Sequence, residues 1–272
     1  MHALLHTHET DQPIAFFGGA YGNLPALRAC LADADAQGAS LKVFLGDATG
    51  CCGHSDETIQ MLLEQCQVLI AGNLEEQAAI GSLSCGCGYG EGEDNRLSCQ
   101  AHAYSLESLG EESRLQISQW PQSGVIATPF GRILLCHGSP DQNNEFLYES
   151  QLDDARLTAW LTENDCAAMA CTHTGLPWVR QLAGQRVAFN AGVVGKPDHD
   201  GDPAVHYALL RWQGGKPIVT LQRVEYDQRA WVTQLRAEGI DEIFLSPLET
   251  GVWTVGVASL PEVERGRAPL AG

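Results

Sequence analysis

The sequence has few basic residues. Its 272 residues include 16 Lys and Arg against 34 Asp and Glu, which gives a formal net charge of -18 at pH 7. This charge repels both the phosphate backbone of nucleic acids and anionic lipid surfaces. The composition therefore argues against a nucleic-acid or membrane partner. It leaves phosphate ester chemistry open, because a bound metal ion can supply the positive charge that the surface lacks.

The sequence also lacks long hydrophobic runs. No stretch of about eighteen apolar residues occurs, and the N-terminus has no basic segment followed by an apolar one. We therefore expect a cytoplasmic protein. Hydrophobic residues still make up 44% of the chain, which is enough for a sizeable core.

Cysteine, by contrast, is plentiful, with ten in the chain. In a reducing compartment, cysteines are metal ligands, redox thiols or buried filler more often than disulfides. Cys30, Cys66 and Cys166 fall on or beside predicted helices and strands, where they fit the core. The remaining cysteines need individual assessment.

Short apolar strands alternate with amphipathic helices in the N-terminal third. Strands are predicted at residues 14–17, 41–45 and 68–71, with helices from residue 24 and over 56–65. This alternation predicts a parallel sheet. Further along, residues 125–128 and 132–136 flank a Pro-Phe-Gly turn and predict an antiparallel hairpin. We divide the chain into a flexible N-terminus (1–12), one α/β domain (13–240) and a C-terminal extension (241–272).

Residues 81–99 interrupt this pattern with a long loop rich in glycine and cysteine. Long loops within compact domains are usually functional or disordered. Cys85 and Cys87 are separated by one glycine, which permits a turn that aims both thiols at one ion, and Cys99 closes the loop.

Four polar residues each follow a predicted strand: Asp47, Asn73, His137 and His173. If these strand ends share one edge, a carboxylate, an amide and two imidazoles can converge on one cation. Each residue taken alone fits a structural role better than a ligand role.

The loop after Asp47 adds Cys51, Cys52 and His54. Hard, soft and intermediate metal ligands thus lie side by side. The alternative is a helix-capping Asp with two small buried cysteines.

Taken together, these blocks resemble the calcineurin-like metallophosphoesterase family. The matching segments are Gly22-Asn23-Leu24-Pro25-Ala26-Leu27, Leu45-Gly46-Asp47-x-x-Gly50, Gly72-Asn73, His137-Gly138-Ser139-Pro140, His173-Thr174, Val194-Gly195-Lys196-Pro197 and Asp200-Gly201-Asp202-Pro203. The resemblance implies two facing mixed β-sheets flanked by helices, an αββα sandwich, with a two-metal phosphoesterase site at the strand ends.

The sequence departs from the family pattern at several positions. Gly19 and Tyr21 stand where the family has an Asp and a His, Leu74 replaces the His thought to protonate the leaving group, and Gly175 replaces a His. In family terms, Asp47, Asn73, His137 and His173 complete the shell of one metal, and the other metal keeps only Asp47. Loss of a general acid alone costs on the order of a hundredfold in rate. We therefore expect ordinary phosphoesterase activity to be weak or absent.

The leading hypothesis is a metal-binding protein with a remodelled two-metal centre. Cys51, Cys52, Cys85, Cys87 and Cys99 would hold a soft metal or an iron-sulfur cluster, and Asp47, Asn73, His137 and His173 a separate Fe, Mn or Zn ion or part of the cluster. Tyr21, Asn23, His54 and Glu75 are possible pocket residues. A small molecule or a redox protein would be the partner.

Two alternatives remain open. A one-metal phosphoesterase would use the same four strand-end ligands, with Glu75 as the acid. A non-catalytic interaction module would bind no metal, and its cysteines would be incidental.

Overall fold

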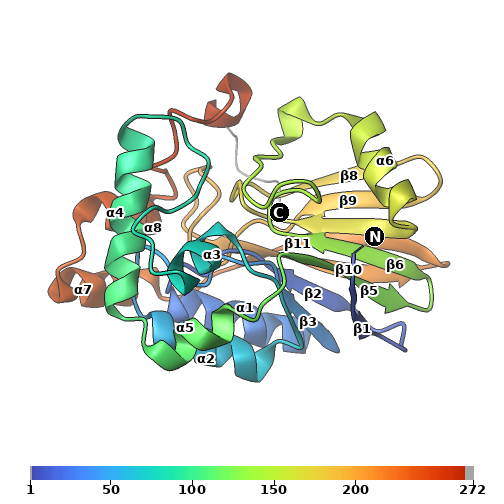
Figure 1. Ribbon diagram of the computed structural model, residues 1–272, viewed down its shortest axis with the longest axis horizontal. Coiled ribbons are helices and arrows are strands. Elements are labelled where there is room, and N and C mark those ends of the chain that lie inside the picture. Colours follow the sequence, from blue (N-terminus) through green and yellow to red (C-terminus); the bar gives the residue numbers. More distant parts are fainter. Residues whose placement is uncertain (1, 267–272) are drawn as a thin grey trace.

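Two mixed β-sheets face each other in the computed structural model, which describes residues 2–266 (Figure 1). The strands are β1 (Leu4–Thr7), β2 (Ile14–Phe17), β3 (Leu41–Phe44), β4 (Val68–Leu69), β5 (Ser123–Thr128), β6 (Gly131–Cys136), β7 (Cys166–Cys171), β8 (Trp178–Leu182), β9 (Arg186–Asn190), β10 (Val205–Gln213) and β11 (Lys216–Val224). The six-stranded sheet has the order β1-β5-β6-β7-β9-β8, and the five-stranded sheet has the order β11-β10-β2-β3-β4. The predicted fold class is confirmed.

The sheets also have the predicted strand directions. β2 pairs in parallel with β3, and β3 with β4, as the alternation of strand and helix requires. β5 and β6 form the predicted antiparallel hairpin. The β10–β11 hairpin extends the five-stranded sheet, because β10 pairs antiparallel with β2.

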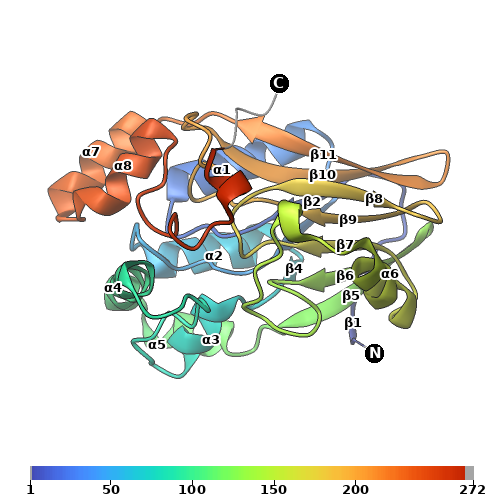
Figure 2. The same cartoon turned by 90° about the horizontal axis from the view of Figure 1, so that it is seen from above.

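Helices cover the outer faces of both sheets. They are α1 (Leu24–Ala36), α2 (Ser55–Gln65), α3 (Asn73–Ala79), α4 (Glu93–Glu107), α5 (Glu111–Ile117), α6 (Asp154–Glu163), α7 (Gln228–Glu238) and α8 (Glu242–Thr250), with short 3-10 turns at Glu149–Gln151 and Glu262–Gly266. Helices α1 and α2 pack on the five-stranded sheet, and α6 packs on the six-stranded sheet (Figure 2). No helix in residues 2–266 is long and apolar enough to cross a membrane.

The core between the sheets follows from strand alternation. On β2, Ile14 and Phe16 point toward the other sheet, whereas Ala15 and Phe17 point toward the helices. The rings of Phe16 and Phe189 meet edge to face with centroids 5.1 Å apart, which joins the two sheets. An aromatic pair of this kind contributes roughly 0.5–1.5 kcal/mol beyond its area burial.

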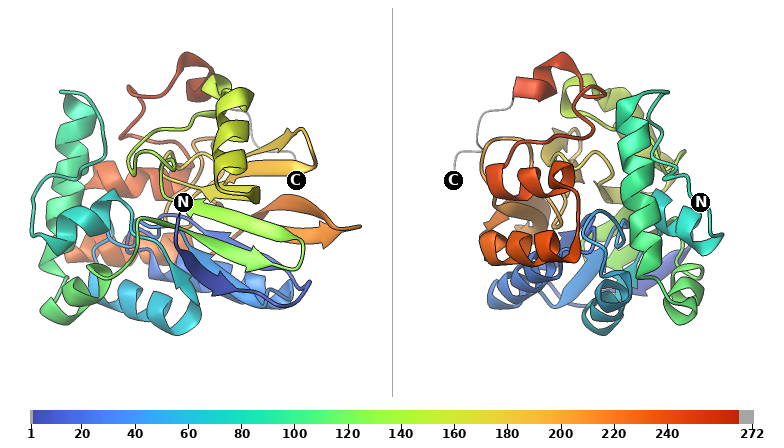
Figure 3. Two further views of the ribbon diagram at one scale, coloured as in Figure 1. Left: turned by 45° about the vertical axis from the view of Figure 1, so that its right-hand side comes forward. Right: turned by 90° about the vertical axis from the view of Figure 1, so that its left-hand side faces the viewer.

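Helices α4, α7 and α8 gather at one end of the sheets. Figure 3 (right) views this end, with α4 on one side and α7 and α8 on the other. The three helices share an apolar cluster that includes Leu97, Trp231 and Leu245. Their position matters because the strand-end loops lie beneath them.

Two predicted segment assignments need correction, and the structure adds detail to a third. Residues Leu4–Thr7 lie within the expected flexible N-terminus but form β1, because their backbone pairs with β5. The loop predicted over 81–99 ends at Gly92, because α4 begins at Glu93, so Cys99 lies on a helix. The C-terminal extension contains α8, begun by an Asp241 cap. Residues 1 and 267–272 of the outer segments lie outside the described residues.

Candidate metal centre

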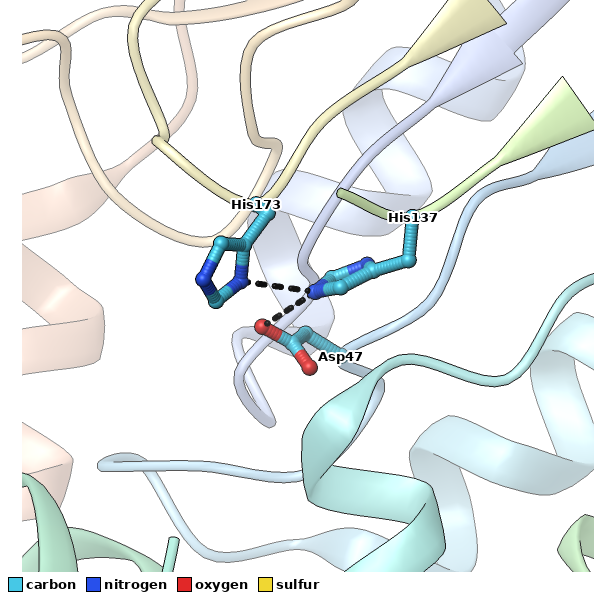
Figure 4. A group of neighbouring side chains, drawn as sticks. All are labelled: Asp47, His137 and His173. Carbon is cyan, nitrogen blue, oxygen red and sulfur yellow. Dashed lines mark hydrogen bonds and ion pairs between the residues drawn. The ribbon is translucent and has the colours of Figure 1, made fainter. Parts of the chain in front are cut away.

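The four strand-end residues converge at the end of the sheets. Asp47 follows β3, His137 directly follows β6, His173 follows β7, and Asn73 opens α3 after β4. Both sheets therefore contribute ligands to one point. Figure 4 shows Asp47 and His173 both facing the same ring nitrogen of His137.

The distances place His137 at the middle of this group. Its Nε2 lies 3.3 Å from Asp47 Oδ2, 3.1 Å from His173 Nδ1 and 3.1 Å from Asn73 Oδ1. Asp47, His137 and His173 are buried and bring their ligand atoms within 4.8 Å of one another. Within residues 2–266, this is the one set of three or more His, Cys, Asp or Glu residues that does so.

Neighbouring carbonyl groups fix which atoms face the centre. Leu45 O lies 2.7 Å from His137 Nδ1, and Cys87 O lies 3.2 Å from His173 Nε2. A carbonyl can only accept, so these nitrogens carry the protons, and His137 Nε2 and His173 Nδ1 present lone pairs. The Asn73 amide donates to Cys85 O at 2.8 Å, which turns its oxygen toward His137.

Four lone-pair atoms therefore face one another with no donor between them when both imidazoles are neutral. Such an arrangement is repulsive by itself and is stabilised by a cation. One carboxylate, one amide oxygen and two imidazoles suit a divalent first-row ion such as Mn, Fe or Zn. The residues present thus fit a metal ion.

The ionisation of the three buried side chains agrees with a site for a metal ion. Burial alone lowers the pKa of His137, but the Asp47 carboxylate, together with the Leu45 carbonyl and the charge of Glu75, raises it above its usual value. Burial would raise the pKa of Asp47, yet His137 holds it below its usual value. Burial and the charge of His137 lower the pKa of His173 to about 3. Without an ion, a proton on His137 balances Asp47, so metal and proton compete for the same place.

The backbone of the site is strained and held by Glu75. Asp47 and His173 have φ of 68° and 61°, a left-handed conformation that non-glycine residues adopt at a cost. The buried Glu75 carboxylate accepts from Asp47 N at 2.7 Å, Ala48 N at 2.8 Å and Gly72 N at 2.8 Å. It thereby ties the two ligand-bearing turns together.

Glu75 does not fit the pocket role predicted from the sequence. Burial, and next the charge of Asp47, raise its pKa to about 7, which suits an acid. However, both oxygens bind backbone N–H groups, and Glu75 is not among the residues that line the cavity. We assign it a positioning role.

A cavity of about 120 Å³ lies in front of the centre. Helices α4 and α8 and the chain beyond α8 form its outer wall. The wall includes Tyr21, Asp47, Cys51, Leu74, Cys87, Tyr89, Phe146, His173, Lys196 and Trp253. The cavity is therefore charged at the metal ligands and apolar around them.

The cysteines fall into two groups. Cys87 N lies 3.3 Å from Cys85 Sγ, and Cys85 N lies 3.4 Å from Cys99 Sγ, which makes a row of three thiols that we call the thiol row. Cys87 lies at one end of this row, and its Sγ is 3.5 Å from the Asn73 amide nitrogen. In the other group, Cys51 lines the cavity and Cys52 is buried against the α7–α8 cluster, with their sulfurs 4.0 Å apart.

Two predicted pocket residues lie away from the centre. Asn23 caps α1 by accepting from Ala26 N at 3.3 Å and donates to Gly195 O and Tyr226. His54 Nε2 lies 2.9 Å from Glu238 on α7. Neither residue lines the cavity, so both have structural positions.

Two cavity residues are absent from the predicted site. Lys196 lies in a glycine-rich turn that could border the pocket but is more typical of a solvated loop, and the structure places it half-buried in the cavity wall. Trp253 comes from the C-terminal extension, where no periodicity or motif pointed to it. A lone tryptophan in an otherwise unpatterned tail was the one signal that could have indicated it.

Comparison with known proteins identifies solved structures that share this fold. No model of a protein family and no curated protein matches the sequence. Among solved structures, a metallophosphoesterase from Sphaerobacter thermophilus is similar, with 23% identity, a TM-score of 0.69, and coverage of 89% of this chain and 100% of the other. A hypothetical protein from Pyrococcus horikoshii OT3 is similar with 19% identity, a TM-score of 0.71, and coverage of 89% and 99%.

Each of these two likenesses covers 89% of the chain, and both are likenesses of fold. The chain has the calcineurin-like metallophosphoesterase fold, with a possible metal site at Asp47, His137 and His173.

Proposed function

We propose that the chain is a metal-binding protein whose remodelled centre holds one divalent cation through Asp47, Asn73, His137 and His173. The observation that carries this proposal is the convergence of four lone-pair atoms whose neighbouring N–H groups are all engaged elsewhere. In the metallophosphoesterase pattern, the other metal would need side chains at positions 19, 21 and 175. Gly19 and Gly175 have no side chain, and Tyr21 places a phenol where the pattern has an imidazole.

A bound cation would supply Lewis-acid chemistry to a phosphate ester. The chain's own residues limit hydrolysis of that ester, because the Leu74 side chain has no ionisable proton to give to the leaving group and Glu75 is bonded to backbone N–H groups. Weak or absent turnover of ordinary phosphate diesters is the expected consequence.

Manganese titration of metal-free protein tests the proposal. We expect one Mn²⁺ per wild-type chain and an affinity at least about a hundredfold lower in His137→Gln, which removes the central ligand. His54→Gln is the matched control, because His54 is bonded to Glu238 away from the centre. Equal affinity in wild type and His137→Gln would contradict the proposal.

For the thiol row we propose a soft metal or an iron-sulfur cluster, with Cys51 and Cys52 as further candidate ligands. Three neighbouring thiols support this, as does the pKa of Cys85, which a hydrogen bond with Cys87 lowers to about 7. A thiolate is the form that binds metals. Rearrangement of the Cys-Gly-Cys turn would be needed to bring the sulfurs round one ion.

An absorption spectrum of protein purified without oxygen, with iron and sulfide analysis, tests this second site. A cluster gives thiolate-to-iron absorption that the Cys85→Ser/Cys87→Ser double variant loses. Cys30→Ser, in the core, serves as the control. A spectrum that the double variant leaves unchanged would exclude the thiol row as the ligand.

A one-metal phosphoesterase is the second candidate, because the cavity places Asp47 and His173 on its wall. It predicts manganese-dependent hydrolysis of a simple aryl phosphate that His137→Gln abolishes. Absence of any metal from the protein would favour the interaction module instead. The cytoplasmic location and the small-molecule or redox partner stay predictions.

A further inference from the structure

Side chains fill the space where the metallophosphoesterase pattern would put the second metal, beside positions 19 and 175. A β-carbon added at Gly19 would lie 2.5 Å from Tyr21 Cζ and 2.8 Å from its hydroxyl oxygen. One added at Gly175 would lie 3.3 Å from Lys196 Cε and 3.2 Å from Trp253 Cη2. Side chains at these two glycines would point into this space. Tyr21, Lys196 and Trp253 occupy it instead.

Lys196 is held firmly there. Its Nζ lies 3.6 Å from the centre of a Trp253 ring and 5.8 Å from that of Tyr21, both within the reach of cation–π attraction. Trp253 Nε1 donates to Pro197 O at 2.6 Å, which ties the ring to the turn that carries Lys196. Gly195 N donates to Gly19 O at 2.8 Å, which docks the same turn on the chain before Tyr21.

The Lys196 ammonium has no carboxylate partner. Within residues 2–266, no Asp or Glu oxygen forms an ion pair with it. Of the described residues that line the cavity, Lys196 is the one lysine or arginine. An unpaired ammonium held on a cavity wall is available to an anionic ligand.

We propose that Lys196 replaces the second metal as a fixed positive charge and binds a tetrahedral oxyanion, the phosphoryl group of a phosphate ester, in the cavity beside the retained cation site. This inference rests on the proposed function, since the metal supplies the other positive charge. The aromatic rings of Tyr89, Phe146 and Trp253 on the cavity wall would then face the rest of the ester.

Binding of inorganic phosphate to manganese-loaded protein tests the inference. Lys196→Met keeps the length and apolar contacts of the side chain and removes its charge. We expect phosphate affinity to fall about tenfold or more, the usual contribution of a hydrogen bond to a charged group, with one Mn²⁺ retained. Lys216→Met, at the exposed start of β11, should bind like wild type.

Labelling of the wild-type chain provides a second measurement that needs no variant. Phosphate should slow acetylation of Lys196 by an amine reagent while Lys216 reacts at an unchanged rate, as followed by mass spectrometry. Protection of neither lysine, or equal phosphate affinity in wild type and Lys196→Met, would overturn the inference and show that Lys196 only fills space.

The outcomes separate this inference from the proposed function. Manganese binding with phosphate affinity independent of Lys196 would leave the metal proposal intact and reject the lysine. Phosphate binding that depends on Lys196 in protein that takes up no manganese would support the lysine and reject the metal.

Discussion

The two halves of the centre differ in how their space is used. On one half, Asp47, His137 and His173 present ligand atoms whose orientation is fixed by backbone carbonyls and N–H groups. On the other half, Gly19 and Gly175 provide no ligands, and bulky side chains fill the gap. We call the half with Asp47, His137 and His173 the ligand half, and the half with Gly19 and Gly175 the filled half. The first half resembles a prepared ion site, whereas the second is packed like a protein interior.

In the proposed account, the loss of a metal position leaves no void. The ring of Tyr21 turns back over Gly19, and the Lys196 stem covers Gly175. Positive charge is kept in the filled half as an ammonium. Our proposals assign one half to a metal ion and the other to a lysine, and each can be disturbed separately.

The largest effect should come from Glu75, which supports the ligand half. Glu75→Ala leaves three buried N–H groups without their acceptor, and each unsatisfied group costs about 1–3 kcal/mol. We expect the free energy of unfolding to fall by about 3 kcal/mol or more, together with loss of manganese binding, as measured by urea denaturation and titration.

Glu64→Ala is the control, because Glu64 is exposed on α2 and should change stability by less than about 0.5 kcal/mol. A Glu75→Ala variant that keeps wild-type stability would show that the carboxylate does not hold the turns.

A smaller effect is expected from Gly19→Ala in the filled half. The new β-carbon meets the Tyr21 ring well inside contact distance, and overpacking of this kind costs about 1–3 kcal/mol. Thermal unfolding should show this loss, while manganese affinity stays close to that of wild type. Gly38→Ala is the comparison variant, because nothing lies within 4 Å of a β-carbon at that position. Any loss of stability there comes from its left-handed φ of 78° and not from overpacking. Loss of manganese binding in Gly19→Ala would mean that the halves are not independent.

The smallest effect concerns pH. Burial lowers the pKa of Lys196 to about 8, although Cys51, Cys87, Asp47 and Asp94 oppose this shift. The side chain is thus charged below about pH 8 and neutral above it. Sulfate, whose own charge is constant in this range, should bind about tenfold more weakly at about pH 9 than at about pH 7.

Lys196→Arg is the control for this titration, because a guanidinium stays charged throughout. Its sulfate affinity should change little with pH. The same decline in wild type and in Lys196→Arg would assign the pH dependence to another group.

Much of the fold follows from the sequence. Strand and helix periodicity predicted β2, α1, β3 and α2 in order, and the Pro-Phe-Gly turn predicted the β5–β6 hairpin. β1 escaped because four residues of mixed polarity carry no clear alternation, and their strand depends on pairing with β5. The start of helix α4 was not predicted, because glycine and charged residues precede the first apolar residue of the helix.

The ligand half of the site was also predictable, since each ligand follows a strand. The filled half was not. The sequence showed that Gly19 and Gly175 lacked side chains, but which residues entered the space depended on distant chain segments. Trp253 reaches it from beyond α8, and Lys196 is placed by the docking of its turn on Gly19. Contacts of such long sequence separation leave no local signal.

Native mass spectrometry of metal-free protein titrated with Mn²⁺ tests the central claim most directly, because manganese prefers oxygen and imidazole ligands to thiols. We predict that binding stops at one Mn²⁺ per chain and is lost in His137→Gln. Two manganese ions per wild-type chain would show that the second position still binds metal, and none would show that the four converging ligands do not form an ion site.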